Sequence, residues 1–342
     1  MSDPLALISS NRFHRRVNLH TKYGSLTVSF AEIGCATGPA LLFMPGMFAS
    51  RYLGIPMDVM AERAGVRMIV VDRPGMGAST NVPVAQRLDA WVDIVPRLLD
   101  HLGIPRVSLV SHSAGTTYLL NTWARCRERV NPLIILLAPW VDPGHSHVTS
   151  MQMAQYLPRS AFSLWHHIAH FFVTQAGPVL ASSGAVVRQM SSLSINRTEE
   201  DLSANWLQLE RDYGIAHEEQ AEIVRLVIRF MFDESTVGAD SEVLVCLRKA
   251  EGRSWGVCDD YEEFAQTMAA REQTLGGQVS VKAYFAAKDA LVGSKGQKYF
   301  EECWRAAGGE GVNFVSTTRE ETDHDTLVQS VAVWEEIFSL VQ

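Results

Sequence analysis

The sequence lacks the apolar segments that a membrane anchor or a secretory leader requires. Its 342 residues contain no run approaching the roughly 18 apolar residues of a membrane span. The N-terminal stretch MSDPLALISSNRFHRR has no basic segment followed by an apolar core, as a secretory signal would have. We therefore expect no membrane span and a cytoplasmic location.

Cysteine is sparse and forms no pattern. The five cysteines are odd in number, and none belongs to a CxxC pair. This distribution argues against a disulfide framework and against a zinc knuckle, and it favours free thiols in a reducing cytosol.

Long runs of one charge are absent as well. The net charge is −8, and the short basic clusters RFHRR and RCRERV occur in isolation. Such clusters are typical of solvated faces, and no nucleic-acid motif accompanies them. We therefore do not expect a nucleic-acid partner.

The first 138 residues alternate short β-rich runs with helical segments. SLTVSFAEI alternates in polarity like a half-exposed antiparallel strand, and residues 52–64 and 86–103 have helical spacing. Four nearly continuous apolar runs have the pattern of strands buried on both faces of a parallel sheet: ALLFMP (40–45), VRMIVVD (66–72), RVSLVS (106–111) and LIILLAP (133–139). This alternation predicts an α/β fold, with a mostly parallel central sheet flanked by helices.

The middle of the chain has a different pattern. Strand signals almost vanish over residues 139–275, and apolar residues there recur at helical spacing. The alternation resumes with VSVKAYFAA (279–287), a helix near 295–307, VNFVST (312–317) and an amphipathic helix from about 326. We therefore predict a core built from residues 1–138 and 276–342, with a helical lid inserted at 139–275.

The stretch LVSHSAGTTYLLNT (109–122) places small polar residues between an apolar run and a helix. Ser113 lies at the expected turn, with Ser111 and Gly115 two residues to either side. A serine nucleophile on a sharp strand–helix turn needs small neighbours at those two positions. A helix-capping serine is the alternative interpretation of Ser113, and we expect His112 to pack at the turn.

Several further motifs give the sequence a resemblance to the α/β-hydrolase superfamily. FMPGMF (43–48) resembles the family's oxyanion loop, although Pro45 replaces the histidine that is common there. DRPGMGAS (72–79) resembles its D-x-R-G-x-G-x-S loop. By this likeness, the oxyanion-hole donors are the backbone N–H groups of Met47 and Ala114.

The resemblance also implies the remaining catalytic residues. Asp289 in AAKDALV follows a late strand, and His324 in ETDHDTL follows the last one. The order Ser113, Asp289, His324 is the order that the family uses. Asp142 in PWVDPG remains a second candidate for the acid, because some members place it after the preceding core strand. Epoxide hydrolases and haloalkane dehalogenases of this fold have Asp at the position of Ser113.

Histidine and aromatic clusters mark other positions. HSH (145–147) and HHIAH (166–170) could suggest metal ligands, but no HExxH glutamate accompanies them. We therefore expect no metal and no cofactor. Most aromatic residues of the insertion are expected in its own packing. Four aromatic residues are candidates for substrate contact: Phe48, Trp140, Trp165 and Phe172.

Together these features predict a serine hydrolase that cleaves an ester, lactone or thioester of a mainly apolar small molecule through an acyl-enzyme. HSAGTTYLLNT followed by LLAPWV is similar to a group of fungal hydrolases, which suggests a role in specialised metabolism. The alternatives are a non-hydrolytic enzyme with the same triad (an acyltransferase, C–C hydrolase or lyase) and a non-catalytic small-molecule receptor on this fold.

Overall fold

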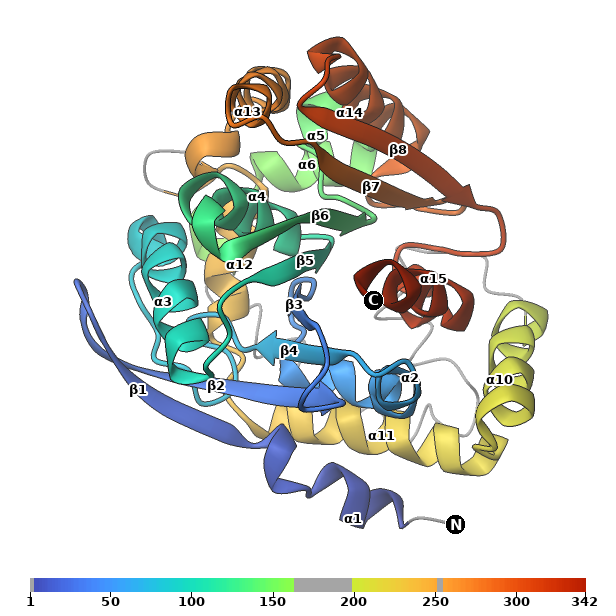
Figure 1. The fold of residues 1–342 in the computed structure, drawn as a ribbon. Helices are drawn as coiled ribbons and strands as arrows, with labels where there is room; N and C mark the ends of the chain where they lie inside the picture. The colour runs from blue at the N-terminus through green and yellow to red at the C-terminus, as the bar shows by residue number, and fades with distance from the viewer. Residues whose placement is uncertain (1–2, 163–198, 251–254) are drawn as a thin grey trace.

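A computed structural model describes residues 3–162, 199–250 and 255–342 of the chain (Figure 1). Within these residues, eight strands form one sheet in the order β1-β2-β4-β3-β5-β6-β7-β8. The strands are β1 (Arg15–Thr21), β2 (Gly24–Gly34), β3 (Ala40–Met44), β4 (Arg67–Val71), β5 (Val107–His112), β6 (Val130–Leu137), β7 (Val279–Ala286) and β8 (Val312–Arg319).

The pairing of the strands matches the polarity patterns of the sequence. The apolar runs form parallel neighbours from β4 through β3, β5 and β6 to β7, and β8 continues this order. Strand β2 pairs antiparallel with both β1 and β4, as its alternating pattern predicted. Strand β1 was not predicted, because a mostly polar edge strand with one buried residue carries little apolar signal.

Helices cover both faces of the sheet. Leu42 and Met44 belong to the apolar layer that also contains residues of α3 (Arg87–His101), α4 (Gly115–Arg125), α13 (Tyr261–Thr274) and α14 (Gly293–Ala307). Leu41 and Phe43 point to the other face, toward α2 (Asp58–Arg63) and α15 (Val331–Val341). Successive side chains of β3 therefore enter opposite layers, as a strand buried on both faces requires. The predicted fold class is confirmed.

Two helix boundaries differ from the sequence prediction. Residues 52–64 form one turn-rich 3-10 segment (Arg51–Met57) followed by α2, because Pro56 has no N–H for an α-helical bond. The C-terminal helix begins at Val331 rather than near 326. Ser330 caps it by accepting a hydrogen bond from the Val333 N–H, and a separate 3-10 turn covers Leu327–Gln329.

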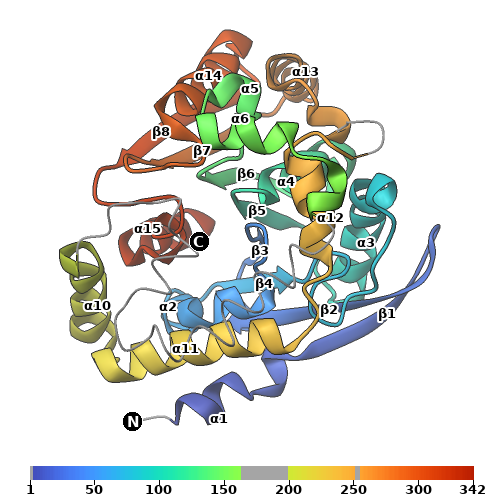
Figure 2. The ribbon, with the colours of Figure 1, turned by 180° about the vertical axis from the view of Figure 1, so that it is seen from behind.

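The segment between β6 and β7 is helical in its described parts. It contains α5 (Pro143–Ser146), α6 (Thr149–Tyr156), α10 (Glu199–Tyr213), α11 (His217–Asp233), α12 (Gly238–Cys246) and α13. Helices α6 and α12 lie on the side turned toward the viewer in Figure 2. There Val243 and Leu247 form a small apolar cluster with Phe162, and Met47 of the core packs against it.

Other helices of this segment pack on the core. Ile223, Leu226 and Val227 of α11 join the apolar layer that contains Tyr52 and α2, and Phe230 packs edge-on against the Tyr52 ring. Helix α13 lies with α14 on the opposite layer. The division into a core and a lid at 139–275 thus stays a prediction. Among the described residues of this segment, Ala154 of α6 and Val243 of α12 belong to the same apolar cluster as Met47.

None of the helices in residues 3–162, 199–250 and 255–342 is both long and apolar enough to cross a membrane. All five cysteines are free, and four of them are buried.

Candidate active site

A sharp turn joins β5 to α4, and Ser113 lies on it. Its φ is 51°, in the left-handed region that side chains rarely adopt, and its N–H donates a 3.0 Å hydrogen bond to the carbonyl of Leu137 in β6. Gly115 begins the helix, and a Cβ there would come within 2.0 Å of the Met44 carbonyl oxygen. Glycine at this position therefore lets α4 approach the end of β3.

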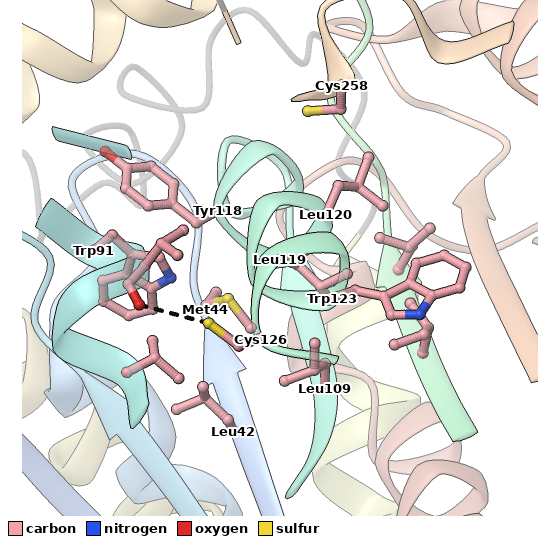
Figure 3. Packing of buried hydrophobic residues seen from close by; sticks show 14 of the residues in the cluster. Leu42, Met44, Trp91, Leu109, Tyr118, Leu119, Leu120, Trp123, Cys126 and Cys258 are labelled. Atoms are coloured by element: carbon pink, nitrogen blue, oxygen red, sulfur yellow. Dashed lines mark hydrogen bonds between the residues drawn. The ribbon is translucent and has the colours of Figure 1, made fainter. Parts of the chain in front are cut away.

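Packing behind the turn holds α4 in place. Leu119 and Trp123 of this helix are buried, together with Leu42 of β3 and Leu109 of β5 (Figure 3). Burying a side chain of this size stabilises the fold by roughly 1.5–3 kcal/mol. Ser113 is thus held between a packed strand and a packed helix rather than on a free loop.

Three side chains from distant parts of the chain meet at this turn. The Nε2 atom of His324 lies 2.7 Å from Ser113 Oγ, and its Nδ1 atom lies 2.8 Å from Asp289 Oδ2. Asp289 follows β7, and its Oδ1 accepts hydrogen bonds from two backbone N–H groups, those of Leu291 and Val292, at 2.8 Å each. The structure therefore brings together the serine, histidine and carboxylate that the sequence order suggested.

The carboxylate and the imidazole shift each other's pKa. Burial alone would raise the pKa of Asp289, but the adjacent His324, together with the Leu291 and Val292 N–H groups, holds that pKa below its usual range. Burial would likewise lower the pKa of His324, yet the carboxylates around it, Asp289 above all, raise that pKa. The pair thus favours a charged carboxylate and a more basic imidazole, which suits proton transfer from a hydroxyl.

His112 is buried beside this group and makes a bond that the sequence did not reveal. Its Nε2 lies 2.8 Å from the backbone carbonyl oxygen of His324. A carbonyl only accepts, so His112 carries its proton on Nε2. Burial, aided by the nearby His324, lowers the pKa of His112 to about 3. His112 is therefore neutral and serves as a fixed donor.

The loop that contains Met47 lies against the same turn. A Cβ on Gly46 would come within 3.3 Å of Ser113 Cβ and 2.8 Å of His112 Nδ1. Ala114, the second predicted oxyanion donor, follows Ser113 directly and is buried. Both predicted donor positions are thus adjacent to the nucleophile candidate, and their role stays a prediction.

The predicted substrate contacts have different positions. Phe48 is half-buried and has a φ of 66°. Trp140 is only 3% exposed, and its indole N–H donates to the Cys246 carbonyl in α12 at 3.1 Å. Trp165 and Phe172 lie outside the described residues. A substrate-binding role for these four side chains stays a prediction.

Asp142, the other candidate for the acid, has structural partners. Its Oδ1 accepts a 2.6 Å hydrogen bond from the Gly144 N–H at the start of α5, and its other oxygen pairs with Arg248. His324 instead contacts Asp289. Asp142 therefore caps a helix and pairs with Arg248 within the segment between β6 and β7.

The histidine motifs show no metal arrangement where they are described. His145 stacks on the Tyr299 ring with centroids 3.9 Å apart. His166 and His170 lie outside the described residues. In the described part of the chain, no three His, Cys, Asp or Glu side chains form a group that could hold a metal ion.

A buried ionic network behind the site was also not predicted. The Arg51 guanidinium bridges Asp72 of the DRPGMGAS loop to Glu234 at the end of α11, at 2.5 and 2.6 Å. Burial raises the pKa of Asp72, and Arg51 only partly offsets this. The motif of residues 72–79 was recognisable in the sequence. No local sequence pattern indicated that a residue of the insertion would join its ionic network.

Comparison with known proteins gives one family match and many structural likenesses. The model of the alpha/beta hydrolase fold matches residues 39–202. A thermophilic esterase from Thermogutta terrifontis is similar over 95% of this chain and 99% of its own, with 16% identity and a TM-score of 0.54. An esterase from Exiguobacterium antarcticum covers 96% and 99%, with 13% identity and a TM-score of 0.58. An ancestral haloalkane dehalogenase covers 96% and 98%, with 17% identity and a TM-score of 0.59.

Proposed function

This chain has the α/β-hydrolase fold, and we propose that it is a serine hydrolase that cleaves an ester, lactone or thioester through an acyl-enzyme. One observation carries the proposal: Ser113, on the strained turn after β5, is hydrogen-bonded to His324, which is hydrogen-bonded to Asp289. The esterases among the similar structures support the reaction class. The dehalogenase likeness does not extend to the turn, where this chain has serine instead of aspartate.

The reaction follows from the three side chains. His324 Nε2 accepts the proton of Ser113 as Oγ attacks the substrate carbonyl carbon, and Asp289 stabilises the imidazolium that forms. When the tetrahedral intermediate collapses, the bond to the leaving group breaks and His324 returns the proton to that group. Water, activated by the same imidazole, then hydrolyses the acyl-enzyme and releases the acid. In this proposal the Met47 and Ala114 amides stabilise the oxyanion, at about 3–4 kcal/mol per donor.

The substrate class that we propose is a mainly apolar small molecule. Met47 packs against the apolar cluster of Phe162, Val243 and Leu247 from the insertion. An acyl or lactone body placed between the oxyanion loop and this cluster would gain ~25 cal/mol per Å² of apolar surface buried. Such contacts distinguish homologues that differ by one methylene only weakly, by about 1–3 kcal/mol.

Covalent labelling tests the nucleophile. A fluorophosphonate should label wild-type protein, and peptide mapping should locate the adduct on Ser113. Ser113→Ala should abolish both labelling and ester turnover. Ser111→Ala is the matched control, because this neighbouring serine is buried on β5 and its hydroxyl has no hydrogen-bond partner within the described residues. Labelling that persists in folded Ser113→Ala would contradict the assignment.

A substrate panel tests the class. We expect faster turnover of apolar esters and lactones than of charged ones, and Leu247→Ala should reduce that preference. Leu207→Ala is the control, since Leu207 lies on α10 and is 62% exposed. Labelling of Ser113 without turnover of any panel member would instead favour the transferase, lyase or receptor alternatives.

A further inference from the structure

Arg73 is a buried guanidinium that contacts the oxyanion loop. It donates a 2.8 Å hydrogen bond to the Gly46 carbonyl and a second one to the Pro45 carbonyl. These two carbonyls immediately precede Met47. Charge-assisted bonds of this kind are stronger and more directional than neutral ones, so Arg73 fixes the backbone of this loop at two successive peptide groups.

The bond to Gly46 also sets the direction of the Met47 N–H. The Gly46 carbonyl and the Met47 N–H belong to one planar peptide group, and every peptide bond of the described chain is trans. In a trans peptide these two groups point in opposite directions. Holding the carbonyl toward Arg73 therefore turns the N–H away from Arg73, while Gly46 itself lies against Ser113.

The other side of the Arg73 guanidinium is held by the insertion. Glu242 of α12 accepts from Arg73 through both carboxylate oxygens, one of them at 2.7 Å, and both side chains are at most 1% exposed. Burial would lower the pKa of Arg73, but the groups around it, the Glu242 carboxylate above all, raise that pKa. Arg87 donates to the same carboxylate at 3.1 Å. Arg73 and Glu242 thus form a buried ion pair in which both side chains are hydrogen-bonded.

The start of α12 is fixed against the core next to this pair. The Gly238 N–H donates to the Gly75 carbonyl at 2.9 Å, and a Cβ on Gly238 would come within 2.5 Å of the Pro74 carbonyl oxygen. The insertion therefore meets the loop that contains Arg73 in direct backbone contact. Glu242 therefore contacts Arg73 from a helix whose start is held against the core.

We infer that Arg73 is a positioning residue for the oxyanion hole and that Glu242 sets its orientation from the insertion. The inference rests on the proposed serine-hydrolase function. A merely structural role predicts only a loss of stability on mutation. A positioning role predicts a loss of transition-state stabilisation, because the Met47 donor would no longer be held where the oxyanion forms.

The experiment compares two buried arginines. Arg73→Lys retains the charge but loses the planar fork that binds two carbonyls and a carboxylate at once. Arg51→Lys is the matched control, because Arg51 is equally buried and pairs with the insertion through Glu234, yet its side chain donates to the Phe13 carbonyl and not to the oxyanion loop. The kcat and KM of both variants are measured with p-nitrophenyl butyrate, per active site titrated by fluorophosphonate.

We expect Arg73→Lys to lower kcat by about 10- to 100-fold with KM within about twofold, since removing one oxyanion donor lowers kcat by about 10²–10³. Inhibition by a trifluoromethyl ketone, whose adduct carries an oxyanion, should weaken in parallel. Arg51→Lys should lose stability but keep kcat within about threefold. If Arg73→Lys does not fold, the isosteric Glu242→Gln variant tests the inference instead. We expect it to lower kcat by a smaller factor, again with KM nearly unchanged.

Three results would overturn the inference: a wild-type kcat in the folded Arg73 or Glu242 variant, an equal fall of kcat in the Arg51 variant, or a change confined to KM. A failure of the proposed function has a different signature, because wild-type protein itself would then show no labelling of Ser113 and no ester turnover.

Discussion

The Nε2 atom of His112 lies 2.8 Å from the backbone carbonyl oxygen of His324, so the last residue of β5 holds the loop that follows β8. The two imidazole rings are 5.0 Å apart. The residue before the candidate nucleophile thus fixes the main chain of the candidate base. This bond links the segments of the two candidate catalytic residues across 212 positions of the sequence.

Removing the His112 donor should slow catalysis by displacing His324. We expect His112→Leu to lower kcat by about tenfold, because small displacements of a catalytic group are costly, and to lower the free energy of unfolding by about 1–3 kcal/mol. His112→Gln, whose amide nitrogen can reach the same carbonyl, should recover much of the loss. Steady-state kinetics and urea unfolding of both variants check this. Equal activity of the Leu variant and wild type would contradict it.

The pH dependence of kcat/KM should show one acid limb, above pH 6.5. His324 must be neutral to accept the Ser113 proton, and the Asp289 carboxylate raises its pKa above the ordinary value of about 6.5. Activity should therefore fall as pH drops through that raised pKa. His112, with a pKa of about 3, stays neutral throughout and adds no second limb.

Asp289→Asn provides the control for this profile. Without the Asp289 carboxylate, burial lowers the pKa of His324 against only the smaller influence of Asp323 and Asp325, so the acid limb of the residual activity should move to lower pH. A limb that stays in place would assign the titration to another group.

The sequence predicted those features of the fold that depend on local pattern. The continuous apolar runs identified the inner parallel strands, and the small residues around Ser113 identified the turn, because a Cβ at position 115 would collide with the Met44 carbonyl oxygen. The polar edge strand β1 lacked such a signal. Only Val17 and Leu19 of this strand pack in the core, where they lie opposite Val28 and Leu26 of β2.

Contacts between distant segments could not be predicted from pattern. The Arg73–Glu242 pair joins residues 169 positions apart, and the Arg51–Glu234 pair joins residues 183 apart. The burial of an ion pair gives neither segment a periodic pattern of apolar residues. A single charged residue in the sequence is typical of a solvated surface. Only the folded arrangement reveals that these side chains are buried and paired.

The two candidate acids should respond very differently to mutation. Asp289→Asn should lower kcat by about 10⁴-fold, because the amide can hold the imidazole in the wrong tautomer. Asp142→Asn keeps an oxygen that can cap α5 and loses only the partly exposed ion pair with Arg248, at about 1 kcal/mol of stability or less. Turnover of one ester by both purified variants checks this. A crippled Asp142 variant beside a nearly normal Asp289 variant would assign the acid to Asp142.

The strain at Ser113 should appear as a reversed order of stability between two inactive variants. Ser113→Ala and Ser113→Gly both lose the bond to His324, but only glycine adopts a φ of 51° without the steric cost of a Cβ, about 1–2 kcal/mol. The greater freedom of glycine in the unfolded chain offsets about 0.5–1 kcal/mol of this gain. We therefore expect the free energy of unfolding of the Gly variant to equal that of the Ala variant or to exceed it by up to about 1.5 kcal/mol. Position 111 is the control, because Ser111 lies in the regular strand β5, where Ser111→Gly should be less stable than Ser111→Ala. Urea unfolding of the four variants measures both differences, and the same order at both positions would show that the turn stores no strain.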